Sequence, residues 1–117
     1  MFELTPNDFL DRGQRLVSKF SSKPTIVKFY LPQCGWCKAS QPDYVALDKT
    51  AGVYFNVAQM DISKYREWSF DVNNSSVTGY KLKGYPTYAV FVKSTFRTLY
   101  NGNRTTSDML SVLAHLA

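Results

Sequence analysis

The chain has 117 residues, and its 14 Lys and Arg against nine Asp and Glu give a net charge of +5 with the single histidine neutral. We predict a single domain over residues 1–117, because domains most often contain about 100–150 residues. Aromatic residues make up 15% of the chain, which argues against disorder. Two cysteines are too few for a disulfide-dense secreted scaffold.

The basic residues are spread along the chain, and no three of them are consecutive. Nucleic-acid surfaces more often show a basic cluster or stripe, so we predict no nucleic-acid partner. The start, Met1–Pro6, lacks the features of a secretory signal, and no apolar stretch approaches the ~20 residues of a membrane helix. We therefore expect a soluble, cytoplasmic protein without membrane contact. A chain whose leader had been removed would look the same, and then the ER or another oxidising compartment is the alternative.

A first helix is predicted from Thr5 to Phe20. Thr5 can cap it, Pro6 suits the first helical position, and Asp8 lies where the helix dipole favours a negative charge. The apolar residues within this range would face the core, and Ser21–Pro24 would end the helix.

The rest of the chain alternates between strands and helices. Thr25–Leu31 is apolar except for Lys28, which is typical of a strand buried on both faces. The early strand–helix–strand succession requires parallel strands, and the late strand pair forms a hairpin. The fold class is therefore α/β, a mixed β-sheet with helices on both faces. The other expected elements are a helix at Gly35–Thr50 kinked at Pro42, a strand at Val53–Met60, one or two helical turns near Tyr65–Phe70, an exposed loop at Asn73–Ser76, strands at Thr87–Lys93 and Phe96–Tyr100, and a last helix from Thr105.

The chemistry is concentrated in Cys34-Gly35-Trp36-Cys37, which follows a buried strand and opens a helix. Free N–H groups and the dipole at a helix N-terminus stabilise an anion, so a thiolate at Cys34 would have a lowered pKa. Cys37 lies one turn further on the same side, close enough for a disulfide. We predict that Cys34 attacks a substrate disulfide and that Cys37 then resolves the mixed disulfide.

Three other roles for the cysteines are open. A structural disulfide closing so short a loop would remove little entropy from the unfolded chain. A zinc site needs about four ligands, and the only histidine, His115, lies near the far end, so we predict no metal. Two buried, inert thiols fit poorly with the polar and glycine-containing surroundings.

These features resemble the thioredoxin superfamily, and its protein disulfide isomerase domains most closely. The resemblance covers most of the chain and implies a thioredoxin-like three-layer sandwich. It is carried by Phe2–Thr5 with Asp8-Phe9, Val27–Lys38, Pro42, Asp61, Gly84-Tyr85-Pro86-Thr87 and Tyr100–Thr105.

The resemblance also implies how a substrate is held. Pro86 would follow a cis peptide bond and lie against the two cysteines. The backbone of Tyr85 would pair with an extended substrate, with Gly84, Pro86 and Trp36 as further substrate contacts. Gly35, Trp36, Lys28 and Pro86 would support the active site. No organic cofactor is implied, because the reaction needs only the two sulfurs, protein substrates with thiols or disulfides, and an external redox partner.

The sequence departs from the family in four places. Gln33 replaces the usual Trp before the first cysteine, and Trp36 occupies a position that is often His or Pro. Lys28 stands where the family often has a buried acid. It either lowers the pKa of Cys37 or extends its amine to water. The chain is also longer at 62–79, as an adaptor surface or as a longer surface loop.

The predicted function is that of an enzyme, a thiol–disulfide oxidoreductase or isomerase acting on protein substrates. The alternative is a binding or chaperone module with the same fold, in which the cysteines are secondary. The direction of electron flow depends on the reduction potential, which the sequence does not specify.

Overall fold

A seven-stranded mixed sheet forms the centre of the molecule, in the order β1-β5-β4-β6-β7-β3-β2. The computed structural model describes residues 1–116. The four long strands are β4 (Thr25–Tyr30), β5 (Asn56–Asp61), β6 (Thr87–Val92) and β7 (Thr95–Tyr100). β4 pairs in parallel with β5 and antiparallel with β6, and β6 forms a hairpin with β7. The predicted mixed sheet is therefore confirmed.

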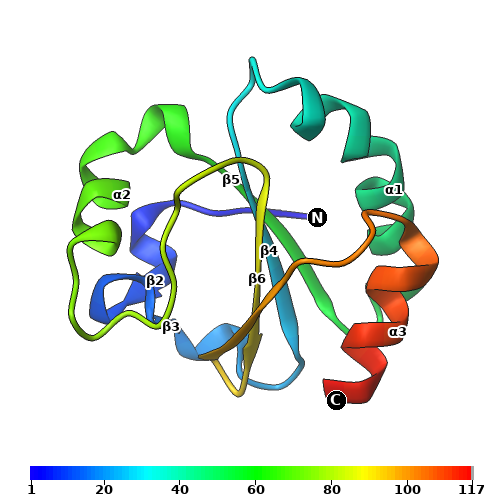
Figure 1. Cartoon of the computed structure of the whole chain (residues 1–117). Coiled ribbons are helices and arrows are strands. Elements are labelled where there is room, and N and C mark those ends of the chain that lie inside the picture. Colours follow the sequence, from blue (N-terminus) through cyan, green and yellow to red (C-terminus); the bar gives the residue numbers. More distant parts are fainter. Residues whose placement is uncertain (117) are drawn as a thin grey trace.

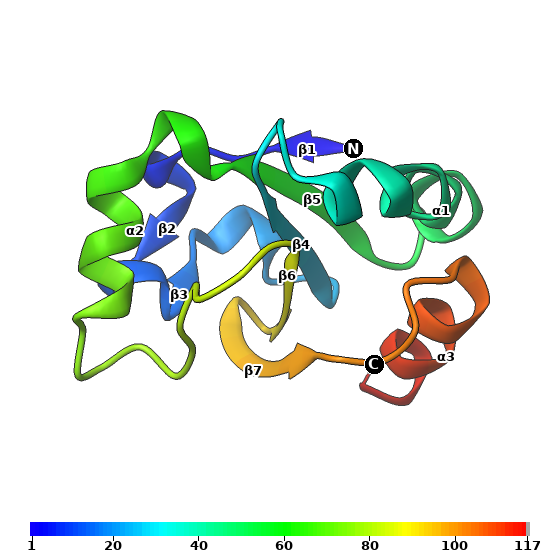
Figure 2. The same ribbon diagram turned by 45° about the horizontal axis from the view of Figure 1, so that its top comes forward.

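Helices cover both faces of this sheet, as Figures 1 and 2 show. The helices α1 (Gly35–Ala51) and α3 (Thr106–Leu116) lie on one face, and α2 (Arg66–Asn73) lies on the other. Alternate residues of the strands supply two separate cores. One core lies under α1 and α3 and includes Tyr44 and Met109, and the other includes Phe29 and Val72. The architecture is the predicted three-layer sandwich.

The first predicted helix is wrong. Thr5 does form a capping box, with Asp8 accepting from its backbone N–H, but only the 3₁₀ turn η1 (Pro6–Asp8) follows. The chain then forms the two-residue strands β2 (Phe9–Leu10) and β3 (Arg15–Leu16), with the turns η2 (Asp11–Gly13) and η3 (Ser18–Phe20).

Backbone geometry explains why the helix does not form. Asp11, Arg12 and Gly13 all have positive φ, which no α-helix tolerates. Strand pairing then places Phe9 opposite Leu16, and both side chains are buried. The apolar residues of this segment enter the core from a hairpin rather than from one helix face.

The remaining boundaries agree closely with the prediction, with two shifts. The strand expected at Val53–Met60 begins only at Asn56, because residues 52–54 form a turn in which Val53 and Tyr54 are exposed. The loop expected to be exposed at 73–76 begins one residue later, and Ser75 within it is buried, where its hydroxyl accepts the N–H groups of Val77 and Thr78.

Gly13 should be one of the least replaceable residues for stability. Its φ is +92°, and a Cβ there would lie 2.8 Å from the hydroxyl oxygen of Tyr80 and 3.1 Å from a methyl group of Val72. We expect Gly13→Ala to lower the free energy of unfolding by about 2–3 kcal/mol in urea titrations. Gly35→Ala is the matched control, since a Cβ at Gly35 meets nothing within 4 Å. Equal stability of the two variants would contradict the prediction.

Candidate active site

Cys34 and Cys37 lie where β4 ends and α1 begins. Cys34 is the N-cap residue of α1, with extended backbone angles. The N–H of Cys37 donates to Cys34 Sγ at 3.1 Å, and both cysteines are free thiols. The Cys34 sulfur therefore receives an N–H that the start of the helix would otherwise leave without an acceptor.

The two sulfurs differ in their access to solvent. Cys37 is only 3% exposed, whereas Cys34 is half-buried. Burial raises the pKa of the Cys37 thiol to about 11, and the hydrogen bond with Cys34 acts in the same direction. Cys37 is therefore a thiol at neutral pH, and only Cys34 is open to a large partner.

The loop that leads into β6 lies directly against Cys34. The peptide bond between Tyr85 and Pro86 is cis, and the carbonyl oxygen of Tyr85 is 3.4 Å from Cys34 Sγ. The side-chain amide of Asn73, at the end of α2, makes two hydrogen bonds with the backbone of this loop. Its oxygen accepts from the Leu82 N–H at 2.6 Å and its nitrogen donates to the Leu82 carbonyl at 3.1 Å. The loop is thus tied to α2 three residues before Tyr85.

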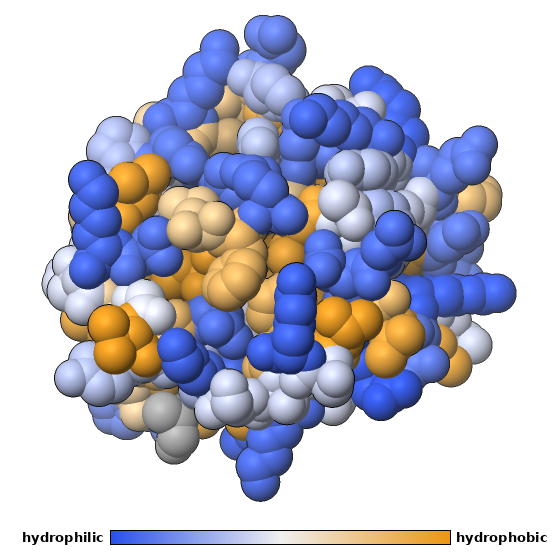
Figure 3. All heavy atoms as spheres, turned by 180° about the vertical axis from the view of Figure 1, so that it is seen from behind, coloured by the Kyte–Doolittle hydropathy of each residue, from blue (hydrophilic) through white to orange (hydrophobic). Residues whose placement is uncertain are grey.

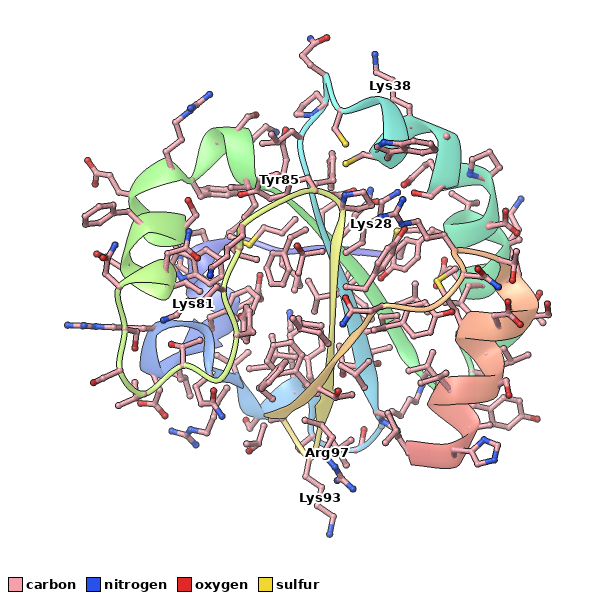
Figure 4. The ribbon with its side chains drawn as sticks, viewed as in Figure 1. Lys28, Lys38, Lys81, Tyr85, Lys93 and Arg97 are labelled. Atoms are coloured by element: carbon pink, nitrogen blue, oxygen red, sulfur yellow. The ribbon has the colours of Figure 1, made fainter. Side chains whose placement is uncertain are left out.

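Lys28 is completely buried beneath the start of α1, between the sheet and the helix (Figure 4). Its Nζ donates to the Cys37 carbonyl at 2.8 Å, to Ser40 Oγ at 3.1 Å and to Gln41 Oε1 at 2.7 Å. The interpretation that its amine extends to water is therefore wrong. Three protein acceptors take the place of water.

Burial and charge act on Lys28 in opposite directions. Burial lowers its pKa to about 8, while the neighbouring Cys37 and Cys34 sulfurs raise it. The positive charge of Lys28 in turn lowers the pKa of Cys37, although burial of that thiol dominates. Lys28 and Cys37 are thus electrostatically linked, which was one of the two roles open from the sequence.

A polar chain connects this buried site to the surface. Gln41 Nε2 donates to Gln59 Oε1 at 2.9 Å, and Gln59 donates in turn to Glu3. A depression of about 340 Å³ opens here, lined by Cys37, Gln41 and Gln59 among others. Water can thus approach the buried sulfur from this side.

Sequence reasoning missed Ser40 and Gln41. On the other side of Lys28, the Tyr88 hydroxyl donates to Ser40 at 3.0 Å. The missed signal was helical spacing, because Ser40 and Gln41 follow Cys37 by three and four residues and so share its face of α1.

The thioredoxin family model matches residues 3–115 of the chain. The chain belongs to the thioredoxin family. Among curated proteins it is 35% identical to protein disulfide-isomerase 1 of Dictyostelium discoideum over 95 residues, which are 79% of this chain and 24% of that protein. It is 33% identical to protein disulfide-isomerase A6 of Mus musculus over 91 residues, which are 74% of this chain and 19% of that protein.

Solved structures share the fold of this thioredoxin domain. The Trx4 domain of ERdj5 superposes with a TM-score of 0.71 at 18% identity, over 98% of this chain and 93% of that one. The first thioredoxin domain of mouse protein disulfide-isomerase A4 gives a TM-score of 0.63 at 23% identity, over 80% of this chain and 63% of that one.

The chain spans about a quarter or less of the length of these curated relatives. The comparisons do not support the cytoplasmic location expected from its first residues. None of the helices within residues 1–116 is long and apolar enough to cross a bilayer.

The residues around the cysteines give this thioredoxin domain a distinctive rim. Trp36 is 71% exposed, and Gln33 before Cys34 is also exposed. Trp36 lines a depression of about 410 Å³ together with Asp43 and Arg104. The rim thus offers one large aromatic surface beside polar and charged groups.

Other sequence-predicted features lie away from the cysteines. The ring of His115 contacts the carbonyl of Ser111 in the last helix. Across residues 1–116, no three His, Cys, Asp or Glu side chains gather where they could hold a metal ion. The 62–79 segment is mainly structural, because Trp68 packs on Phe9 and Phe29 and covers one face of the sheet. Only Phe70 and Val77 are large exposed apolar residues in this segment.

Proposed function

We propose that the chain is a thiol–disulfide oxidoreductase that exchanges disulfides with protein substrates through Cys34 and Cys37. The observation that supports it most is the unequal pair at the start of α1. One sulfur is half-buried and accepts a helix N–H, and the other is buried one turn further along. Membership of a family with protein disulfide-isomerase relatives supports the same reaction class.

The reaction has two exchange steps. The Cys34 thiolate attacks one sulfur of a substrate disulfide, forming a mixed disulfide and releasing the other substrate sulfur as a thiolate. Cys37, after losing its proton, attacks Cys34 Sγ and releases the second substrate sulfur. Two electrons pass from the protein dithiol to the substrate, and the two protons end on the released thiols. An external dithiol restores the pair, and the reverse sequence donates a disulfide.

The groups around the cysteines have separate roles in this proposal. The Tyr85 carbonyl next to Cys34 marks where an extended substrate backbone would pair, with Gly84, Pro86 and Trp36 as flanking contacts. The space beside Gly35 is open, since a Cβ there would meet nothing within 4 Å, and this leaves room for a substrate next to Cys34. Lys28 acts on Cys37 electrostatically from below.

The alternative function is a binding or chaperone module. The 71% exposure of Trp36 beside a depression of about 410 Å³ favours it, because an exposed tryptophan is a common anchor for protein partners. In that case the cysteines would be secondary to binding.

Covalent trapping separates the two functions. Cys37→Ser should accumulate a mixed disulfide through Cys34 with a disulfide-containing peptide, because nothing then resolves the first product. Cys34→Ser is the control and should form no such adduct. Non-reducing electrophoresis and mass spectrometry detect the adduct. If Cys37→Ser forms no adduct while peptide binding is the same in both variants, the oxidoreductase proposal fails and the binding module is favoured.

A further inference from the structure

A basic depression lies beside the Tyr85–Pro86 loop. Its volume is about 610 Å³, and its charged lining residues are Lys81, Lys83 and Arg104, with no carboxylate among them. Figure 4 shows Lys81 and Tyr85 on the same loop, in front of the sheet. Tyr85 lines this depression, and its carbonyl oxygen lies 3.4 Å from Cys34 Sγ. The depression therefore adjoins the candidate active site.

The positive charges of this depression are not neutralised within residues 1–116. The ion pairs among the described residues use the cations of Met1, Arg15 and Lys19. None of them uses Lys81, Lys83 or Arg104. Lys81 Nζ donates to the Ser75 carbonyl, which is an uncharged acceptor. Lys83 and Arg104 are exposed. Three cations without acidic partners make the depression an attractive site for carboxylates.

The same charges reach the sulfur site. Arg104 lines both this depression and the one beside Trp36. Arg66 is a further cation close to Tyr85, because its guanidinium opposes the rise in the Tyr85 pKa that burial causes. Asp43 is the one carboxylate in the depression beside Trp36, and its Oδ1 already accepts from the Thr106 N–H and hydroxyl. A polypeptide lying over Cys34 would therefore meet cations on more than one side.

We propose that Lys83 and Arg104, with Lys81, make this domain select protein disulfides flanked by acidic residues. The selectivity rests on the proposed oxidoreductase function, because it concerns the substrate of the same site. Carboxylates on either side of the substrate cysteine would lie along the basic depression while the cysteine faces Cys34. The like charges of a basic segment would repel it from the same place.

The test compares three disulfide peptides that differ only in having Asp, Ser or Lys beside the cysteine. The enzymes are the wild type, the double variant Lys83→Glu/Arg104→Glu, and the control Lys93→Glu/Arg97→Glu. The control changes net charge equally at the opposite end of the molecule (Figure 4). For the wild type at low salt, kcat/KM should be about tenfold higher for the acidic than for the basic peptide. The preference should be lost or reversed in the double variant, kept in the control, and weakened at high salt.

Each contrary outcome has its own meaning. Equal rates with all three peptides, with normal turnover of the Ser peptide, would overturn the selectivity while leaving the oxidoreductase function intact. Equal loss of preference in both double variants would assign it to net charge and overturn the role of the depression. No turnover of any peptide by the wild type would instead contradict the proposed function.

Discussion

At pH 7, iodoacetamide should alkylate Cys34 at least about 100-fold faster than Cys37. The reagent reacts with thiolates, and a thiol with a pKa of about 11 is ionised to only about one part in 10⁴ at this pH. Cys37 is also 3% exposed, so the reagent can scarcely reach it. Cys34 is half-buried and its sulfur accepts a helix N–H. The rates should therefore differ in the order that the attacking and resolving roles require.

Peptide mapping by mass spectrometry measures both rates in the same wild-type protein. This avoids variants at Cys34, whose hydrogen bond contributes to the raised pKa of Cys37. Alkylation of Cys37 should also rise about tenfold for each pH unit between pH 7 and 10, since the thiolate fraction does so below the pKa. Similar rates for the two cysteines at pH 7 would contradict the assignment of roles.

Replacing Lys28 with Met should stabilise the fold at pH 7 by about 1–3 kcal/mol. A buried cation is costly, and an apolar side chain of similar length avoids that cost. The three acceptors around Lys28 would each keep another hydrogen-bond donor or access to water after the substitution. Ser40 keeps the Tyr88 hydroxyl as a donor, the Cys37 carbonyl keeps the Ser40 hydroxyl, and Gln41 borders a depression open to water.

The gain should depend on pH in a defined direction. The pKa of Lys28 falls from 10.5 to about 8 on folding, so between these values the unfolded chain holds more protons. The stability contributed by Lys28 therefore rises with pH through this window. The advantage of Lys28→Met should shrink by about 1.4 kcal/mol per pH unit between pH 8 and 10. Cys37, whose pKa is raised, gives both proteins a stability trend of the opposite sign. That trend is larger in the variant, which lacks the Lys28 charge, so it adds to the expected decrease.

The same substitution should impair exchange. Without the positive charge that lowers the pKa of Cys37, release of the mixed disulfide should be about tenfold slower at pH 7, and its pH profile should move to higher pH. Lys38→Met is the matched control, an exposed lysine on the same helix, and should change stability by less than about 0.5 kcal/mol. A Lys28→Met protein that is clearly less stable at pH 7, with an unchanged pH profile, would contradict both expectations.

Much of the site could be predicted because its parts are close in sequence. The strand Thr25–Tyr30, the turn and α1 follow one another, so the position of Cys34 at a helix start needed no tertiary information. The burial of the Lys28 amine did not follow, because it depends on Ser40 and Gln41 of α1 lying over β4. The basic depression could not be predicted either, because Lys81, Lys83 and Arg104 come together only when β7 is paired with β6.

The N-terminal segment could not be predicted from composition for a related reason. Its capping signal at Thr5 was correct locally, but long-range pairs decided what came next. β3 pairs with β7, where Arg15 lies opposite Thr95, and the hydroxyl of Tyr80 donates to the Gly13 carbonyl at 2.8 Å. These contacts join residues more than sixty positions apart, and helix propensity does not report them.

The placement of this N-terminal segment at both ends of the strand order has a consequence for aggregation. β1 pairs with β5 and β3 pairs with β7, so the two six-residue strands that would otherwise border the sheet have short two-residue strands beside them. On the face seen from behind in Figure 3, hydrophobic residues lie in small patches among hydrophilic ones. Exposed long strand edges invite an unfolded partner to add a further strand. β1 thus occupies the edge of β5 at Ala58 and Gln59, and β3 occupies the edge of β7 at Thr95, so a further strand could pair only with the shorter lengths that remain.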